Sequence, residues 1–107
     1  MFVAALQALL EREAGIEIVA STDNGAQALE LDRALSPDVA VVDLDLPVMD
    51  GFETTRRLVA QHPALRVVAI SGLSGDGVAA RAADAGASDY LFKGGLHGEI
   101  VDAILMH

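Results

Sequence analysis

The chain has no cysteine and no tryptophan, and it has only one tyrosine and three phenylalanines in 107 residues. Without cysteine, neither a disulfide nor a thiolate metal site can form. Basic residues are also scarce, because seven lysines and arginines stand against sixteen aspartates and glutamates, a formal net charge of −9. This balance argues against direct contact with a nucleic acid. No apolar run approaches membrane-spanning length, so we expect a cytoplasmic protein without membrane contact.

The residues that are abundant describe a compact globular chain. Hydrophobic residues make up 52% of the sequence and charged residues 21%, which is unlike a disordered segment. A length of 107 residues is enough for one hydrophobic core and too short for two. The opening stretch "MFVAALQALLERE" has no basic leader, so we interpret it as an amphipathic helix and not as a signal peptide.

Helix and strand patterns alternate along the sequence. Helical spacing and capping signals predict a first helix ending near Gly15, a second between Asn24 and Pro37, a third between Asp50 and Pro63, and later helices over 78–85 and 96–106. Short apolar runs predict strands over 16–20, 38–43, 66–71 and 89–93. This alternation predicts the α/β class, with a parallel sheet that carries helices on both faces.

Three polar residues end three of the predicted strands. Asp43 follows "VAVV", Ser71 follows "RVVAI", and Lys93 follows "DYLF". In parallel sheets the carboxyl ends of the strands meet at one rim, where ligands gather. A carboxylate facing an ammonium and a hydroxyl can accept a phosphoryl group, the carboxylate as nucleophile and the other two as partners of the transferred oxygens.

Each of these residues also has a purely structural interpretation. Asp43 can cap the turn after its strand, Ser71 can be an ordinary turn residue, and Lys93 can be a solvated strand end. Tyr90 can simply pack in the last strand, and Asp50 is better explained as a helix cap than as a ligand.

The motifs resemble the receiver domain of bacterial two-component response regulators over the whole chain. "VVDLDLPVMDG" is similar to the family's phosphoacceptor segment, with Asp43 as the acceptor, Pro47 four residues on and Gly51 eight residues on. "VVAISG" is similar to the strand that carries the switch hydroxyl, here Ser71. "AGASDYLFK" is similar to the last strand, with Tyr90 as the switch aromatic residue and Lys93 as the phosphate-contacting lysine.

The resemblance implies a flavodoxin-like, doubly wound sheet and a role in a phosphorelay. A histidine kinase or a small phosphodonor would phosphorylate Asp43, and Ser71 and Tyr90 would then shift together. The receiver would itself not be an enzyme. It would control an output domain, most simply a DNA-binding transcription regulator, that we expect beyond His107.

The front of the chain departs from the family pattern. Receivers begin with a strand ending in an acidic pair, whereas this sequence opens directly into its first helix, so we interpret residues 1–107 as an N-terminally shortened receiver. Of the family's Mg²⁺ ligands only Asp43 and the backbone carbonyl of Asp45 remain, so we expect an incomplete site and weak binding. At the other end, Gly94 and Gly95 follow the lysine where the family usually has proline.

The absent strand would lie in the middle of the sheet, so the backbone groups along one side of residues 38–43 would need other hydrogen-bond partners. We expect a core of four strands per chain, and a homodimer in which Phe2, Leu6 and Leu9 are buried against the partner.

Two alternatives have different functional consequences. A degenerate receiver would never take phosphate and would serve as a docking or dimerisation module. A haloacid-dehalogenase-like phosphatase would use Asp43 as nucleophile and Asp45 as general acid. Pro47 and Gly51 fit the receiver better, and no later acidic motif of the phosphatases follows Lys93.

Overall fold

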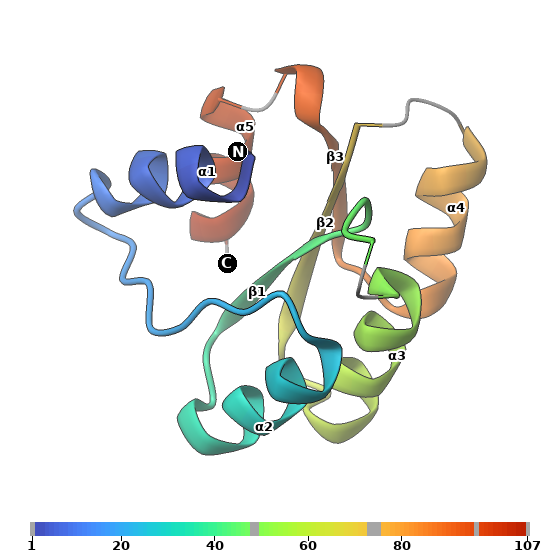
Figure 1. The fold of residues 1–107 in the computed structure, drawn as a ribbon. Coiled ribbons are helices and arrows are strands. Elements are labelled where there is room, and N and C mark those ends of the chain that lie inside the picture. Colours follow the sequence, from blue (N-terminus) through green and yellow to red (C-terminus); the bar gives the residue numbers. More distant parts are fainter. Residues whose placement is uncertain (1, 48–49, 73–75, 96, 107) are drawn as a thin grey trace.

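The computed structural model describes residues 2–47, 50–72, 76–95 and 97–106 (Figure 1). The elements follow in the order α1 Phe2–Glu11, α2 Gly25–Leu35, β1 Val39–Asp43, α3 Gly51–Gln61, β2 Arg66–Ser71, α4 Asp76–Ala85, β3 Asp89–Phe92, the 3₁₀ turn η1 Lys93–Gly95, and α5 His97–Leu105. None of the described helices combines the length and the apolar character that a membrane crossing requires.

The three strands form one parallel sheet in the order β1-β2-β3. In the register of the sheet, Val41 lies opposite Val68, and Ser71 lies opposite Phe92. β2 is the central strand, and all its residues after Arg66 are buried. The strands therefore run in one direction and end at a common rim, as the alternation of elements predicts.

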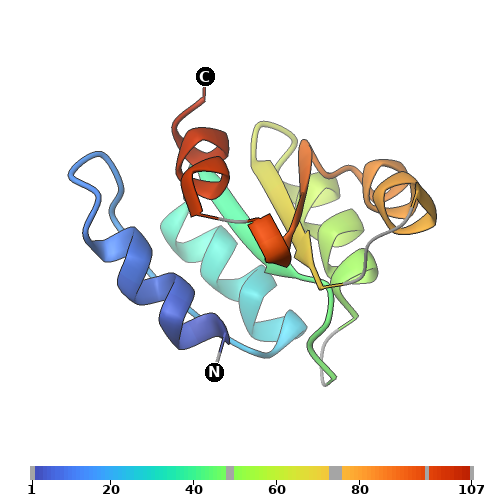
Figure 2. The same cartoon turned by 90° about the horizontal axis from the view of Figure 1, so that it is seen from above.

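Helices cover both faces of the sheet, α1 and α5 on one face and α2, α3 and α4 on the other (Figures 1 and 2). The first face is built on Leu10, Val68, Ile70, Ile100 and Ala103, and the second on Val42, Leu58, Leu65 and Val67. Leu6 and Leu9 pack against the first of these clusters. One chain thus supplies the cover that the sequence analysis assigned to a second copy. The side chain of Phe2 lies outside the described part.

The predicted helix starts at α2 and α3 are confirmed by their caps. The Asn24 side chain accepts a hydrogen bond from the N–H of Gln27, and the Asp50 side chain accepts bonds from the N–H groups of Phe52 and Glu53. Each cap gives partners to N–H groups that have none within the helix. Asp50 is therefore a capping residue, as expected.

The strand predicted over 16–20 is wrong. These residues are extended but belong to no strand, so the described sheet has three strands and not the expected four. The physical reason is that a strand exists only through pairing, and no described strand lies beside this segment. The apolar residues Ile16 and Ile18 still pack on the α1–α5 side of the sheet, which explains their alternation. The first helix also ends at Glu11, four residues before Gly15.

A large cavity lies between this extended segment and β1. Its volume is about 1040 Å³, and its walls include residues 15–22 on one side and residues 36–43 on the other. Among the described residues, β1 pairs only with β2. The bonds from Leu44 N–H to Ile70 and from Arg66 N–H to Asp38 fix the alternation of the ladder. Consequently the N–H groups of Val39, Val41 and Asp43 point away from β2, toward the cavity.

The exposed apolar side chains gather at the same place. Of the five large hydrophobic residues that are exposed in the described part of the chain, all but Phe92 line this cavity: Val19, Leu35, Leu105 and Met106. Exposed apolar residues scattered singly need no explanation, but a cluster beside an open strand edge marks an incompletely covered core.

Amide hydrogen exchange tests the open edge. We expect the N–H of Val41 to exchange faster than that of Val42, because the first faces the cavity and the second is bonded to β2. The two residues are adjacent and of the same type, so each serves as the control of the other. Equal protection of both amides, measured by NMR, would show that something pairs with this edge in solution.

Candidate functional site

The three polar residues predicted at the strand ends do meet at one rim. Asp43 is the last residue of β1, Ser71 is the last of β2, and Lys93 directly follows β3 as the first residue of η1. Asp43 and Ser71 are buried, with 7% and 0% of their surface exposed. Polar groups are buried at such cost only where partners are available, and the rim supplies these partners.

An ion pair joins the ends of the two outer strands. Lys93 Nζ lies 2.9 Å from Asp43 Oδ2 and 3.1 Å from Asp45 Oδ2. The other oxygen of Asp43, Oδ1, accepts a hydrogen bond of 2.9 Å from the N–H of Asp45. The Asp43 carboxylate is therefore held in one orientation by a cation and a backbone donor.

The sequence analysis missed the role of the Asp45 side chain in the receiver, where it considered only the backbone carbonyl of this residue. Its Oδ1 accepts a 2.8 Å hydrogen bond from Ser71 Oγ, and its Oδ2 accepts a 2.6 Å bond from the N–H of Gly72. A signal was present in the motif Asp-x-Asp, because alternate residues beyond a strand end can point to the same side. Only the turn geometry of residues 44–45 decides it.

The rim shifts the pKa values of two of its groups. Partial burial acts to raise the pKa of Asp45, but the hydrogen bonds from Gly72, Ser71 and Lys93 outweigh it and bring the pKa below its ordinary value of 3.8. Burial acts to lower the pKa of Lys93, and its bonds to Asp43 and Asp45 outweigh that effect and raise the pKa above 10.5. Lys93 is thus charged at neutral pH, and so is Asp45.

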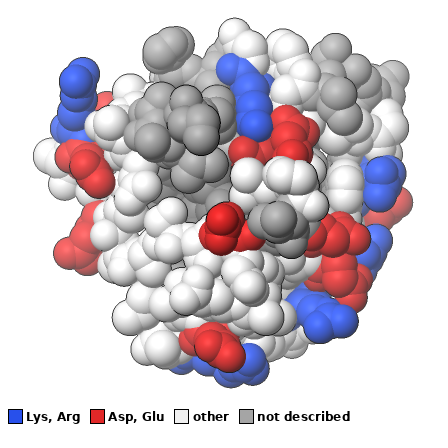
Figure 3. All heavy atoms as spheres, viewed as in Figure 1, with Lys and Arg blue, Asp and Glu red and all other residues white. Residues whose placement is uncertain are grey.

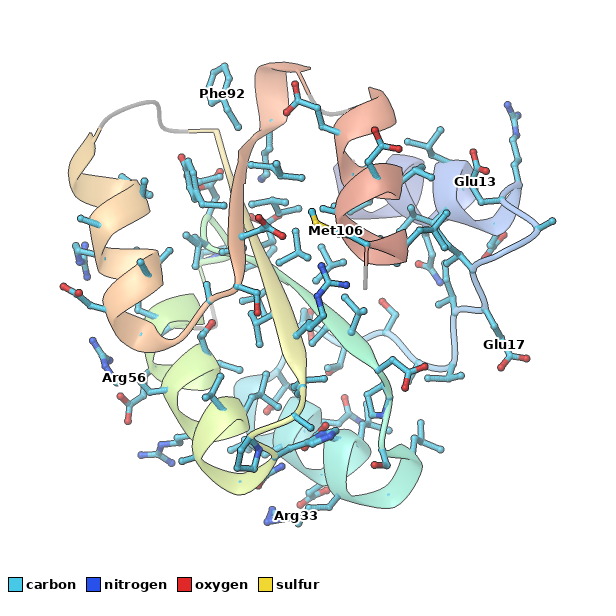
Figure 4. The ribbon with its side chains drawn as sticks, turned by 180° about the vertical axis from the view of Figure 1, so that it is seen from behind. Glu13, Glu17, Arg33, Arg56, Phe92 and Met106 are labelled. Carbon is cyan, nitrogen blue, oxygen red and sulfur yellow. The ribbon has the colours of Figure 1, made fainter. Side chains whose placement is uncertain are left out.

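Tyr90 lies in β3 opposite Ala69 and is half-buried, so the structure places it on the last strand as predicted, three residues before Lys93. Phe92 projects from the rim end of β3 with 42% of its surface exposed (Figure 4). Gly94 lies against the Phe92 ring, where a Cβ atom would collide with the ring. A glycine after the lysine therefore permits the tight η1 turn.

One histidine has a partner away from the rim. His62 Nδ1 lies 2.8 Å from Asp32 Oδ1, and Gln61 Nε2 donates to Asp32 Oδ2 at 2.9 Å. Asp32 is buried, so these contacts tie the end of α3 to α2. They support the fold and contribute nothing to the rim.

The surface charges of the described residues are mixed in sign. On the face drawn in Figure 3, acidic and basic side chains are interspersed, in line with the acidic balance of the chain. In the parts of the chain that the structure describes, no three histidine or acidic side chains are placed to hold a metal ion.

Comparison with known proteins identifies the family. The model of the response regulator receiver domain matches residues 1–105. The chain belongs to this family. Receiver domains are signalling modules that interact with histidine kinases and phosphodonors and are not themselves catalysts. The flavodoxin-like fold and the place of the chain in two-component signal transduction are thereby confirmed.

Two curated relatives have different whole proteins around the receiver. The chain is 38% identical over 90 residues to the response regulator GacA of Pseudomonas viridiflava. The aligned region covers 84% of this chain and 42% of that protein. It is 41% identical over 87 residues to a protein-glutamate methylesterase/protein-glutamine glutaminase of Paramagnetospirillum magneticum. Here the aligned region covers 79% of this chain and 23% of that protein. The chain therefore spans less than half of each relative.

Two solved structures are similar throughout. A LuxR-family two-component response regulator from Aurantimonas sp. SI85-9A1 has a TM-score of 0.88 at 35% identity, covering 94% of this chain and 72% of that one. A response regulator from Burkholderia pseudomallei, solved with a phosphorylated aspartic acid, a calcium ion and citrate, has a TM-score of 0.84 at 28% identity, covering 98% and 61%.

Receiver domains generally bind Mg²⁺ at the phosphorylation site, but the described residues of this chain do not complete such a site. Magnesium prefers octahedral oxygen coordination with one or two carboxylates and several waters. The two carboxylates at the rim, Asp43 and Asp45, are already engaged by Lys93, and Asp45 is also bonded to Ser71 and Gly72. The incomplete site stays a prediction, which the engagement of both carboxylates supports.

We expect calorimetric titration of residues 1–107 with MgCl₂ to give only weak binding, because each ion must displace Lys93 from a carboxylate. The variant Lys93→Met should bind Mg²⁺ more tightly than the parent chain, since it removes the competing cation from both carboxylates. Tight binding by the parent chain would show that other groups complete the site.

Removing Lys93 should also change stability in a pH-dependent way. At pH 7 we expect Lys93→Met to lower the free energy of unfolding by about 1–3 kcal/mol, because two neighbouring carboxylates lose their cation. The folded-state pKa of Asp45 is depressed, so its contribution exists above pH 3.8 and is lost as the pH falls through the folded-state value. The difference between variant and parent should therefore shrink in acid.

Urea unfolding at pH 7 and at pH 3 measures this difference. The exposed cation Arg33 provides the matched control, since Arg33→Met removes one positive charge far from the rim. The assigned ion pair would be contradicted if Lys93→Met lowered the free energy of unfolding by the same amount at both pH values. It would also be contradicted if Arg33→Met caused the same loss.

Proposed function

We propose that this chain is a phosphoacceptor receiver domain in which Asp43 takes a phosphoryl group from a histidine kinase or a small phosphodonor. The observation that carries the proposal is the 2.9 Å contact between Lys93 Nζ and Asp43 Oδ2 at the rim where the Ser71 hydroxyl also ends its strand. The printed description of the Burkholderia pseudomallei relative, with its phosphorylated aspartic acid, supports the same chemistry here.

The chemical step is a nucleophilic displacement at phosphorus. A carboxylate oxygen of Asp43 forms a bond to phosphorus as the bond from phosphorus to the donor's leaving group breaks, and the leaving group keeps the electron pair. The product is an acyl phosphate. Lys93 Nζ, Ser71 Oγ and the N–H of Gly72 are donors within reach of the transferred oxygens, where they offset developing charge.

We propose that Ser71 and Tyr90 carry the switch. Ser71 ends the central strand, and Tyr90 lies on the neighbouring edge strand β3. A shift of the Ser71 hydroxyl toward a phosphoryl group can therefore be transmitted to β3. The shift would alter the face formed by α4, β3 and α5, which is the face that new charge at Asp43 biases.

The phosphatase interpretation is disfavoured by the state of Asp45. A general acid must hold a proton near neutral pH. The pKa of Asp45 is lowered, and its oxygens accept hydrogen bonds from Ser71 and Gly72. The side chain therefore lacks the proton that this role requires.

The output of the natural protein is a further part of the proposal. We infer a DNA-binding transcriptional output, which the LuxR-family description of the Aurantimonas relative supports. The methylesterase relative supports an enzymatic output instead, and the sequence of the complete protein would decide between them. A cytoplasmic location follows from the proposed role in a phosphorelay.

We also propose that the activated domain forms a homodimer, but not through α1. Leu6 and Leu9 already pack on the chain's own core, whereas the face of α4, β3 and α5 carries the exposed Phe92 on an edge strand. An edge strand with an exposed aromatic side chain is a suitable surface for a second copy.

Labelling with acetyl phosphate and mass spectrometry tests the phosphoacceptor. With long incubation we expect slow modification of Asp43 only, since the metal site is incomplete. Asp43→Asn should abolish the label, and Asp50→Asn, which keeps the α3 cap outside the rim, should retain it.

Label that persists in Asp43→Asn would refute the assignment. An unlabelled parent chain under all conditions would favour the degenerate docking module.

A further inference from the structure

The three donors at the rim are all directed at one side chain that is not the acceptor. Asp45 receives hydrogen bonds from Ser71 Oγ at 2.8 Å and from the N–H of Gly72 at 2.6 Å, and Lys93 Nζ lies 3.1 Å from it. The donors come from the ends of two different strands, so their convergence is a product of the fold and not of local sequence.

These are the same groups that a phosphoryl group on Asp43 would need. A carboxylate offers two oxygens and one negative charge, whereas a phosphoryl group offers three oxygens and a charge of about −1.5 to −2. The Asp45 carboxylate and a phosphoryl group on Asp43 cannot accept the same hydrogen bonds at the same time. Two anions that share one ammonium group also repel each other. Occupation by Asp45 and occupation by the phosphoryl group are thus mutually exclusive.

We propose that Asp45 is a built-in competitor that fills the oxyanion site of the resting domain and must leave it when Asp43 is phosphorylated. The inference rests on the proposed function and adds to it a residue that sets the rate of phosphorylation. Asp45 acts through Ser71, Gly72 and Lys93, so it is a positioning residue.

The surroundings of Asp45 permit the exchange. Its side chain is 29% exposed and stands in the turn after β1, so it can rotate into water without disturbing the sheet. Asp43, in contrast, is 8% exposed and fixed by Lys93 and by the N–H of Asp45. Asp43 is therefore enclosed at the rim, whereas Asp45 has a path into water once its contacts with Ser71, Gly72 and Lys93 are broken.

The close contact between Asp45 and the backbone depends on glycine at position 72. A Cβ atom at this position would stand 3.2 Å from Asp45 Oδ2, closer than most side-chain contacts, so glycine lets the carboxylate approach the backbone N–H. The variant Gly72→Ala should therefore loosen Asp45 without touching its charge, which provides a second way to test the proposal.

Anion binding tests the competitor without relying on phosphoryl transfer. Titration with sodium sulfate, followed by NMR of the Gly72 amide, should show binding to Asp45→Ala at least about tenfold tighter than to the parent chain, because a charge-assisted contact no longer has to be broken. Asp45→Asn should lie between the two, since it keeps an acceptor but loses the charge.

The control is Asp102→Ala, which removes one exposed carboxylate from α5 and lies outside the rim. It should leave the sulfate affinity at the parent value. Equal sulfate affinity of parent and Asp45→Ala would overturn the proposal, and so would an equal gain in Asp102→Ala. If Asp45→Ala does not fold, by the dispersion of its amide spectrum, Gly72→Ala replaces it with the same expected direction.

Labelling with acetyl phosphate then separates this inference from the proposed function. Faster labelling of Asp43 in Asp45→Ala, by about tenfold, supports both. Tighter sulfate binding without any label on Asp43 supports the competitor and refutes the phosphoacceptor. Labelling of Asp43 at the parent rate, with unchanged sulfate affinity, supports the phosphoacceptor and refutes the competitor.

Discussion

The ion pair between Lys93 and Asp43 connects the two outer strands of the sheet across the central one. β1 ends in Asp43, β3 is followed by Lys93, and β2 lies between them and ends in Ser71. The 2.9 Å contact therefore ties the ends of β1 and β3 together across the end of β2. A pair with Asp43 so fully buried would be costly to break, because each group would keep its desolvation penalty without its partner.

Much of this arrangement could be predicted from the sequence, because apolar runs that end in a polar residue leave few alternatives. The strands β1 and β2 follow apolar runs of valine, alanine and isoleucine, and the prediction placed their last residues, Asp43 and Ser71, correctly. The failure at residues 16–20 has a physical cause. Alternation records which side chains are covered, and Ile16 and Ile18 are covered, but it says nothing of whether a neighbouring strand is present to pair with.

The Asp45 side chain shows the second limit of sequence reasoning. Residues within a strand alternate between faces, so the direction of Asp43 follows from the run that precedes it. Asp45 lies beyond the strand, in a turn, where direction depends on backbone geometry that no periodicity reports. The sequence thus predicted that Asp43, Ser71 and Lys93 meet at one rim, and it missed the Asp45 side chain that is bonded to the donors there.

The rim and the free edge of β1 differ in how completely their polar groups have hydrogen-bond partners. At the rim, the described buried side-chain polar atoms all have partners. Along the free edge of β1, the backbone groups of alternate residues face a cavity of about 1040 Å³ bordered by exposed apolar side chains. The described hydrogen bonds of the sheet therefore reinforce the rim more completely than the free edge of β1.

The charge at the rim explains why displacement of Asp45 is sufficient for a phosphoryl group to be accommodated. In the resting arrangement one ammonium faces two carboxylates, so Lys93 leaves a net charge of −1. Conversion of Asp43 to an acyl phosphate removes its own charge and adds about −2 on the phosphoryl oxygens. If Asp45 stayed, the net charge would fall to about −2 around a single cation. If Asp45 moves into water, the charge returns to about −1, close to the value for which the donors are already arranged.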